Sequence, residues 1–187
     1  TAALFRELTP TLVRVESLEA AELVKLINNS FRDYVFAFSN QMSQLASAFN
    51  IDISAAIGAA NRGYPRDKVP LPSPGVGGPC LTKDPYIMHH VAQRAEIDET
   101  LFAAGRLVNE SMVPFVVRSI EQIIERTGRT LGQVKIGACG LAFKGKPETG
   151  DLRDSTGVQI ATALAERGAT IVAHDAVATE RTLTEFG

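Results

Sequence analysis

The apolar residues in the first quarter of the chain recur at helical spacing. Between Ser17 and Asn50, apolar side chains follow one another at steps of three or four residues, and no Gly or Pro interrupts them. This period is typical of one long amphipathic helix, with Ser17 as its N-cap. The residues of this apolar stripe are Val24, Ile27, Phe31, Tyr34, Val35, Phe38, Met42 and Leu45.

Shorter patterns predict further helices up to about residue 130. One runs from Asp52, its N-cap, to about residue 61, and another runs from residue 84 to about residue 95. Residues 62–79 between them are rich in Gly and Pro, which predicts an irregular loop.

The last helix of this part is expected over residues 97–128. Asp98 is its candidate N-cap, Pro114 should kink it, and Gly128 should end it. We therefore expect residues 1–130 to form an all-helical domain.

The pattern changes after residue 130. Residues 134–145 form a short β-run that ends in glycines, residues 155–168 an amphipathic helix, and residues 170–175 a second β-run. This order predicts a βαβ unit with a parallel sheet. Two strands alone do not make a stable sheet, so we expect a partial Rossmann-like α/β domain over residues 131–187. The fold class is thus α/β overall.

Composition and charge narrow the functional classes. The chain has 187 residues, 45% of them hydrophobic, and a formal net charge of −2, which offers no broad basic surface for nucleic acid or an anionic membrane. The 2 cysteines and 3 histidines are spaced for neither a disulfide framework nor a metal site. This cysteine usage fits a reducing compartment, so we expect a cytoplasmic protein. No apolar run reaches the length of a membrane span. Because the chain starts without Met and ends within an expected helix, we expect a fragment.

The first candidate for chemistry is the segment PSPGVGGPCLTKDPY, residues 72–86. Cys80 lies where the Gly/Pro loop meets a predicted helix start, and free amides, the helix dipole and Lys83 favour the thiolate there. A bystander cysteine at a helix start explains the same pattern. Cys139, in contrast, lies within a β-run and is expected in the core. The glycines that would let backbone amides approach a ligand closely are Gly75, Gly77 and Gly78.

A second candidate is a pair of polar residues on the long helix. Lys25 and Asn29 are four residues apart, so they share a face, which Arg32 and Asp33 continue opposite the apolar stripe. An amine beside a carboxamide suits an oxyanion and a hydroxyl group. A solvated helix face is the alternative interpretation.

The third candidate is the loop FKGKPETGDLRDS after the first β-run. Lys144, Lys146 and Arg153 follow the carboxyl end of a strand, where open α/β sheets bind ligands and where cations suit phosphate. The preceding GACGLAFKG does not match the dinucleotide pattern G-x-G-x-x-G. We assign no role to the histidines.

Together these segments resemble the UDP-glucose/GDP-mannose dehydrogenase family of nucleotide-sugar 6-dehydrogenases. The resemblance extends from about Ser17 to Asp175 and keeps the family's order. It rests on the segments AELVKLINNSFRDYVFAFSNQM, NRGYPRDKVPLPSPGVGGPCLTKDPY, VNESMVPFVV and KIGACGLAFKGKPETGDLRDS.

The resemblance implies an activity and a set of site residues. The family oxidises the C6 alcohol of a nucleotide sugar to a carboxylate by two hydride transfers to NAD, through a thiohemiacetal and a thioester on a cysteine. The resemblance implies that Cys80 is this nucleophile, Lys25 stabilises the oxyanion with Asn29 as its partner, and Asp84 assists the water or proton steps.

The resemblance also implies contacts to substrate, cofactor and a second subunit. Lys144 would touch the UDP-sugar, as would the glycine loop, and Arg66 would reach the sugar nucleotide of the neighbouring subunit. Lys83 and Arg153 would lie on the side of the NAD cofactor. The long helix would form the core of a homodimer.

Departures from the family pattern leave alternatives open. No G-x-G-x-x-G domain precedes the helices, so we expect this chain alone to be inactive, and Pro79 stands where relatives have serine or histidine. The pattern around Cys80 favours a UDP-N-acetylhexosamine as substrate over UDP-glucose. Other hypotheses are a 6-phosphogluconate-type or hydroxyacid-type dehydrogenase, and a non-catalytic helical dimerisation module.

Overall fold

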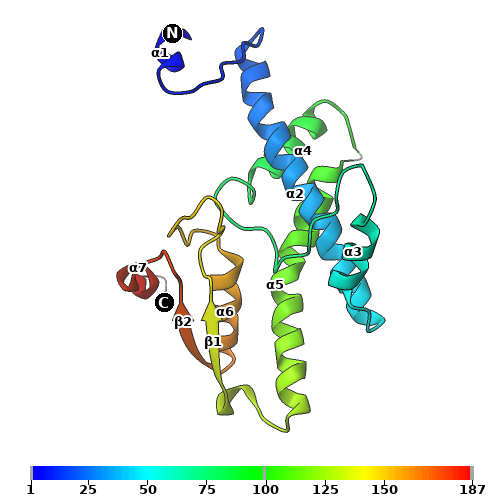
Figure 1. The fold of residues 1–187 in the computed structure, drawn as a ribbon, viewed down its shortest axis with the longest axis vertical. Helices are drawn as coiled ribbons and strands as arrows, with labels where there is room; N and C mark the ends of the chain where they lie inside the picture. Colours follow the sequence, from blue (N-terminus) through cyan, green and yellow to red (C-terminus); the bar gives the residue numbers. More distant parts are fainter. Residues whose placement is uncertain (1, 99, 186–187) are drawn as a thin grey trace.

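A computed structural model describes residues 2–98 and 100–185, and it shows a helical part followed by a small α/β part (Figure 1). The predicted long helix is confirmed as α2, Leu18–Ala48. Ser17 is its N-cap, because the Ser17 Oγ accepts a hydrogen bond from the amide of Ala20 at 3.1 Å. A short helix that the sequence did not predict, α1, covers Ala2–Arg6.

The other helices of the first part follow the predicted order. Helix α3 is Ile53–Asn61 and is capped by Asp52, whose Oδ1 accepts from the amide of Ser54 at 2.9 Å. Helix α4 is Asp84–Arg94, and helix α5 is Leu101–Arg126. Helix α5 is continuous through Pro114, and a kink there stays a prediction.

The predicted start of α5 at Asp98 is wrong, because the termination of α4 extends further along the chain. Glu96 has a φ of 58°, and the amide of Ile97 bonds to the carbonyl of Ala92 at 2.9 Å. Because of this closing turn, α5 begins further along the chain than predicted, and Thr100 is its N-cap.

The α/β part contains the predicted βαβ unit. A short 3₁₀ helix, Leu131–Gln133, leads into strand β1, Lys135–Cys139, helix α6, Thr156–Glu166, and strand β2, Thr170–His174. The strands pair in parallel, with Lys135 opposite Thr170 and Cys139 opposite His174. Helix α7, Glu180–Glu185, follows. A helical domain followed by a partial α/β domain is therefore confirmed.

Helix α5 connects the two parts (Figure 1). Its first half packs against α2 and its second half against α6. Val117 on α5 is buried in one apolar cluster with Leu164 of α6 and Ala169. The α/β core thus includes residues that precede position 130, and the predicted domain boundary there stays a prediction.

The expected burial of Cys139 is wrong. Cys139 is exposed rather than buried, because α6 covers one face of the two strands and the alternate residues of β1 lie on the other face. On α2, Asp33 is fully buried, whereas Phe31 and Phe38 of the apolar stripe are 69% and 48% exposed. The face of α2 that packs inside this chain is therefore the polar one.

Of the helices that the structure describes, none combines the length and apolar character needed to cross a bilayer.

Candidate functional site

Cys80 lies on the turn that leads into α4. The carbonyl of Gly78 accepts hydrogen bonds from the amide and the hydroxyl of Thr82, and the carbonyl of Cys80 accepts from the amide of Asp84 at 2.9 Å. Cys80 is half-buried at a cleft of about 410 Å³ between α2, the glycine loop and the loop after β1. The cleft is lined by, among others, Asn29, Arg32, Phe36, Cys80, Phe143 and Lys144.

Asp84 gathers the predicted polar residues around one buried carboxylate. Asp84 is 1% exposed, and its Oδ2 accepts a hydrogen bond from Asn29 Nδ2 at 2.6 Å. Lys25 Nζ lies 4.0 Å from the same oxygen, and Lys83 forms an ion pair with Oδ1. The structure thus brings together four residues that the sequence places on two separate segments.

The electrostatics of Asp84 keep it ionised. Burial opposes the charge and would raise the pKa of Asp84, but the hydrogen bonds from Lys83 and Asn29 and the charges of Lys83 and Lys25 lower this pKa below its ordinary value. The side chains of Lys25 and Lys83 are 63% and 57% exposed, so their amines lie at the rim. The arrangement offers a fixed anion, a carboxamide and two cations beside a thiol.

The three glycines of the loop are required by protein contacts. A Cβ on Gly77 would lie 2.1 Å from the carbonyl oxygen of Asp154, and one on Gly78, whose φ is 89°, would lie 2.6 Å from the Phe143 ring. A Cβ on Gly75 would lie 2.8 Å from the carbonyl oxygen of Asn109. These glycines let the Cys80 loop touch both α5 and the α/β part, and their approach to a ligand stays a prediction.

The structure places the other predicted cationic residues, Lys144, Arg153 and Arg66, in different positions relative to the cleft. Lys144 lines the cleft, with its Nζ 5.4 Å from the centre of the Phe143 ring. Arg153 forms an ion pair with Asp151 at 2.7 Å, and the hydrogen bond to this carboxylate raises the pKa of Arg153. Arg66 stacks on its neighbour Tyr64 and does not line the cleft.

The glycine-rich turn after β1 holds a carboxylate of the protein itself. Asp175 Oδ2 accepts from the amides of Leu141 and Ala142 at 2.8 and 2.9 Å, and Oδ1 accepts from the amides of Val177 and Ala178 at 2.9 and 2.8 Å. The backbone hydrogen bond from Ala178 makes the largest contribution, and together these bonds lower the pKa of Asp175 to about 2. Asp175, which sequence reasoning left without a role, therefore fastens the two loops at the carboxyl ends of the strands.

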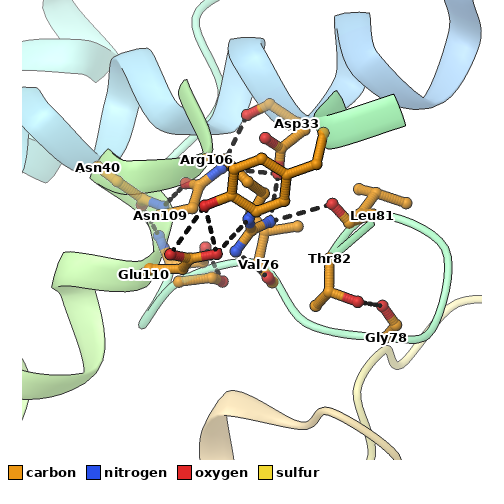
Figure 2. A network of polar contacts seen from close by, with 12 residues as sticks. Asp33, Asn40, Val76, Gly78, Leu81, Thr82, Arg106, Asn109 and Glu110 are labelled. Atoms are coloured by element: carbon orange, nitrogen blue, oxygen red, sulfur yellow. Dashed lines mark hydrogen bonds and ion pairs between the residues drawn. The ribbon is translucent and has the colours of Figure 1, made fainter. Parts of the chain in front are cut away.

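A buried polar network behind the cleft was also missed (Figure 2). Its centre is Arg106 on α5, which contacts Asp33 on α2 and two carbonyls of the Cys80 loop. Asn109 extends the network to Asn40, which accepts from the amide of Ser73 at 2.7 Å. A signal was available, since Asp33 and Asn40 lie two helical turns apart on the same face of the predicted long helix.

Comparison with protein families identifies both parts of the chain. Residues 19–111 match the central domain of the UDP-glucose/GDP-mannose dehydrogenase family, and residues 137–187 match its UDP-binding domain. The chain belongs to this family. The resemblance inferred from the four sequence segments is therefore confirmed.

Curated relatives include UDP-N-acetyl-D-mannosamine dehydrogenases. The protein of that name from Yersinia pestis is 36% identical over 156 residues, which cover 81% of this chain and 36% of the relative. One from Pyrococcus horikoshii is 34% identical over 152 residues, which cover 81% of this chain and 35% of the relative. The chain thus spans about a third of the length of the curated relatives it matches.

Solved structures of the family share the fold. The UDP-D-ManNAc dehydrogenase from Pyrococcus horikoshii superposes with a TM-score of 0.80 at 30% identity, covering 95% of this chain and 41% of that one. A UDP-glucose dehydrogenase from Pyrobaculum islandicum gives a TM-score of 0.72 at 31% identity, covering 90% of this chain and 38% of that one.

Among residues 2–98 and 100–185, no three His, Cys, Asp or Glu side chains are grouped as they would be to hold a metal ion.

Proposed function

We propose that this chain is the central and UDP-binding part of an NAD-dependent nucleotide-sugar 6-dehydrogenase, which oxidises the C6 alcohol of a UDP-N-acetylhexosamine to the uronic acid. The observation that carries this proposal is that Cys80 lines a cleft next to the cluster of Asn29, Asp84 and two lysines. Family membership supplies the reaction class, and the cluster supplies groups that suit it.

The nucleophilic step uses Cys80 and the helix α2 residues. The Cys80 thiolate adds to the C6 aldehyde carbon and forms a C–S bond, while the carbonyl oxygen gains negative charge. Lys25 and Asn29 are four residues apart on α2, and both reach toward Asp84, so their amine and amide lie side by side to stabilise that oxygen. Loss of a hydride from this thiohemiacetal leaves a thioester on Cys80.

The hydrolytic step uses Asp84. A water molecule adds to the thioester carbonyl, the C–S bond breaks, and the products are the C6 carboxylic acid and the Cys80 thiol. Because its pKa lies below the ordinary range, Asp84 is ionised at neutral pH and accepts a hydrogen bond from, or the proton of, the attacking water. Lys83 and Asn29 hold the carboxylate in place.

NAD is the proposed hydride acceptor in both oxidations. The described residues do not complete a dinucleotide site, because the amides after β1 are bound to Asp175 and Arg153 is paired with Asp151. We propose Lys83 and Arg153 only as contacts at the edge of a cofactor held mainly by residues outside this chain, and we expect this chain alone to be inactive.

The proposed substrate rests on the names of the curated relatives and on the position of Lys144 in the cleft. The curated relatives described above are named for UDP-N-acetyl-D-mannosamine, which favours a UDP-N-acetylhexosamine over UDP-glucose. Lys144 lies in the cleft where it would meet the sugar nucleotide. Arg66 stacks on Tyr64 outside the cleft lining, and the proposal that it reaches the sugar nucleotide of a second subunit rests on the family resemblance alone. A cytoplasmic enzyme of polysaccharide synthesis fits this chemistry.

A homodimer through α2 is supported by the exposure of the apolar stripe of that helix, whose polar face packs inside the chain. Ile27, Phe31 and Phe38 are about half-exposed or more and lie along one stripe, although α2 already packs against α5. Monomers rarely leave so large an apolar stripe open to water. Analytical ultracentrifugation of the chain should show a dimer, and a monomer at micromolar concentration would contradict the proposal.

The proposed activity is tested on the product of the full open reading frame that contains this sequence. We expect two NADH per sugar, by absorbance, with one member of a panel of UDP-N-acetylmannosamine, UDP-N-acetylglucosamine, UDP-N-acetylgalactosamine, UDP-glucose and GDP-mannose. Cys80→Ser should abolish turnover, and Cys139→Ser, at the exposed cysteine, is the matched control. Full activity in Cys80→Ser would favour a hydroxyacid-type dehydrogenase. No NADH from any sugar would leave a dimerisation module.

A further inference from the structure

Arg106 lies directly behind the loop that carries the cysteine. It is 2% exposed, and its guanidinium donates to the carbonyl of Val76 at 3.1 Å and to the carbonyl of Leu81 at 3.2 Å. These two carbonyls stand on either side of Cys80 in the sequence (Figure 2). One side chain therefore holds both ends of the segment that contains the thiol.

The guanidinium is itself held from two helices. Asp33 Oδ1 on α2 lies 2.6 Å from Arg106 Nη1, and Glu110 on α5 accepts from Nε at 3.3 Å. Asn109 donates to both the carbonyl and Oδ1 of Asp33 at 2.9 Å. Because the guanidinium is planar and its donors point in fixed directions, this set of partners defines its position.

We propose that Arg106 is a positioning residue that fixes the Cys80 segment against α2 and α5, with Asp33 orienting the guanidinium. The catalytic consequence rests on the proposed function, in which Cys80 is the nucleophile. A reacting group displaced by about 1 Å loses on the order of 10²-fold in rate. The structural consequence, an ordered Cys80 segment, does not depend on that function.

Two physical points separate this role from simple stabilisation. Residues 77–80 belong to no helix or strand, so no regular hydrogen-bond ladder fixes them. A buried ion pair is often no more stabilising than apolar residues of similar volume. What an apolar residue does not provide is donors for the carbonyls of Val76 and Leu81.

The test compares variants of the full-length protein by hydrogen exchange and kinetics. In Arg106→Met, we expect amides of residues 73–84 to exchange about tenfold faster or more, because the loop loses its anchor. We expect kcat to fall about 10²-fold with little change in KM, since Arg106 does not line the cleft. Arg106→Lys keeps the positive charge but not the planar guanidinium with its several donors, and it should recover part of kcat.

Val117→Ala is the matched control on the same helix. Val117 is 1% exposed and packs with Leu164 and Ala169, away from the loop. This variant should lower the unfolding midpoint, while the exchange of residues 73–84 and kcat remain those of the wild type. A loss of kcat in Val117→Ala as large as in Arg106→Met would overturn the proposal.

A double variant removes the effect of overall stability. Arg106→Met with Asp33→Asn eliminates both buried charges, and Asn109 can still donate to the Oδ1 of the new amide. Its unfolding midpoint should recover relative to Arg106→Met, whereas loop exchange and kcat should not. Recovery of kcat together with stability would show that Arg106 acts only through stability.

The two proposals fail separately. If Cys80→Ser retains activity, the nucleophile role is wrong, and faster exchange of residues 73–84 in Arg106→Met still supports positioning. If Cys80→Ser is inactive and Arg106→Met keeps wild-type loop exchange, the positioning role is wrong and the function stands.

Discussion

The helical part and the α/β part of this chain differ in how much polar and charged side chain they bury. Around the Cys80 loop, the most buried residues are polar or charged, among them Asp33, Arg106 and Asn109. The clusters of the α/β part are apolar, with Val117 and Leu164 in one of them. Helix α5 contributes to both interiors along its length.

This difference shows that α5 contributes to a buried polar network at one end and to an apolar cluster at the other. Apolar contacts give stability without direction, so they suit a scaffold. Hydrogen bonds are directional and costly to leave unmade, so a buried polar network specifies the position of an irregular loop. The variants below should affect stability in one part and loop geometry in the other.

The largest loss of stability is expected from Leu164→Ala in the apolar cluster. Leu164 is 2% exposed, and its truncation should cost about 4 kcal/mol of unfolding free energy through lost burial and a cavity. Urea denaturation measures the loss. Iodoacetamide alkylation of Cys80 in the folded protein should keep its wild-type rate, and a change there would show that the two interiors are coupled.

Gly77→Ala should affect the Cys80 loop first. The new Cβ would lie 2.1 Å from the carbonyl oxygen of Asp154, so the loop and the α/β part must move apart. We expect this to lower the free energy of unfolding by about 3 kcal/mol. With the proposed function, kcat of the full-length protein should fall about 10²-fold. Gly58→Ala on α3 is the control, because nothing lies within 4 Å of that Cβ. Wild-type kcat in Gly77→Ala would show that this contact is dispensable.

Asp175→Asn should lower the free energy of unfolding by about 2 kcal/mol at neutral pH. The reason is that the side chain that accepts four backbone hydrogen bonds loses its negative charge and one of its two acceptor oxygens. The pKa of Asp175 falls from 3.8 to about 2, so its contribution is full above pH ~4 and is lost as pH falls toward 2. Denaturant titrations at pH 7 and about pH 3 should show the gap between variant and wild type narrowing on acidification.

The control for that titration is Asp52→Asn at the N-cap of α3, since asparagine caps a helix about as well as aspartate. A gap between Asp175→Asn and wild type that stayed constant with pH would contradict the assigned role of the carboxylate.

The smallest effect is expected from Arg167→Ala. Arg167 pairs with Glu121 at 3.2 Å between the end of α6 and α5, but its side chain is 45% exposed. Solvent screens such a pair, so the unfolding free energy should change by less than about 1 kcal/mol. Thermal denaturation at low and high salt checks this, and a loss comparable to that of Leu164→Ala would show that charge also holds the α/β part.

Much of the local structure could be predicted from the pattern. The caps Ser17 and Asp52 and the order of helices and strands follow from short-range hydrogen bonding and apolar period. The candidate residues Lys25, Asn29 and Cys80 were singled out from their segments and Asp84 from the family resemblance, and their roles stay predictions. An error arose where burial decided the outcome, as for the exposed Cys139.

The sequence by itself thus determined most of the elements, the family and part of the cleft lining, because spacing and local chemistry are written along the chain. Only the tertiary structure decided which face of α2 packs inside, that Asp84 collects Asn29 and two lysines, and that Arg106 holds the loop around Cys80. These contacts join residues far apart in sequence, and each depends on how α2, α4 and α5 pack together. No periodicity within one segment reports that packing.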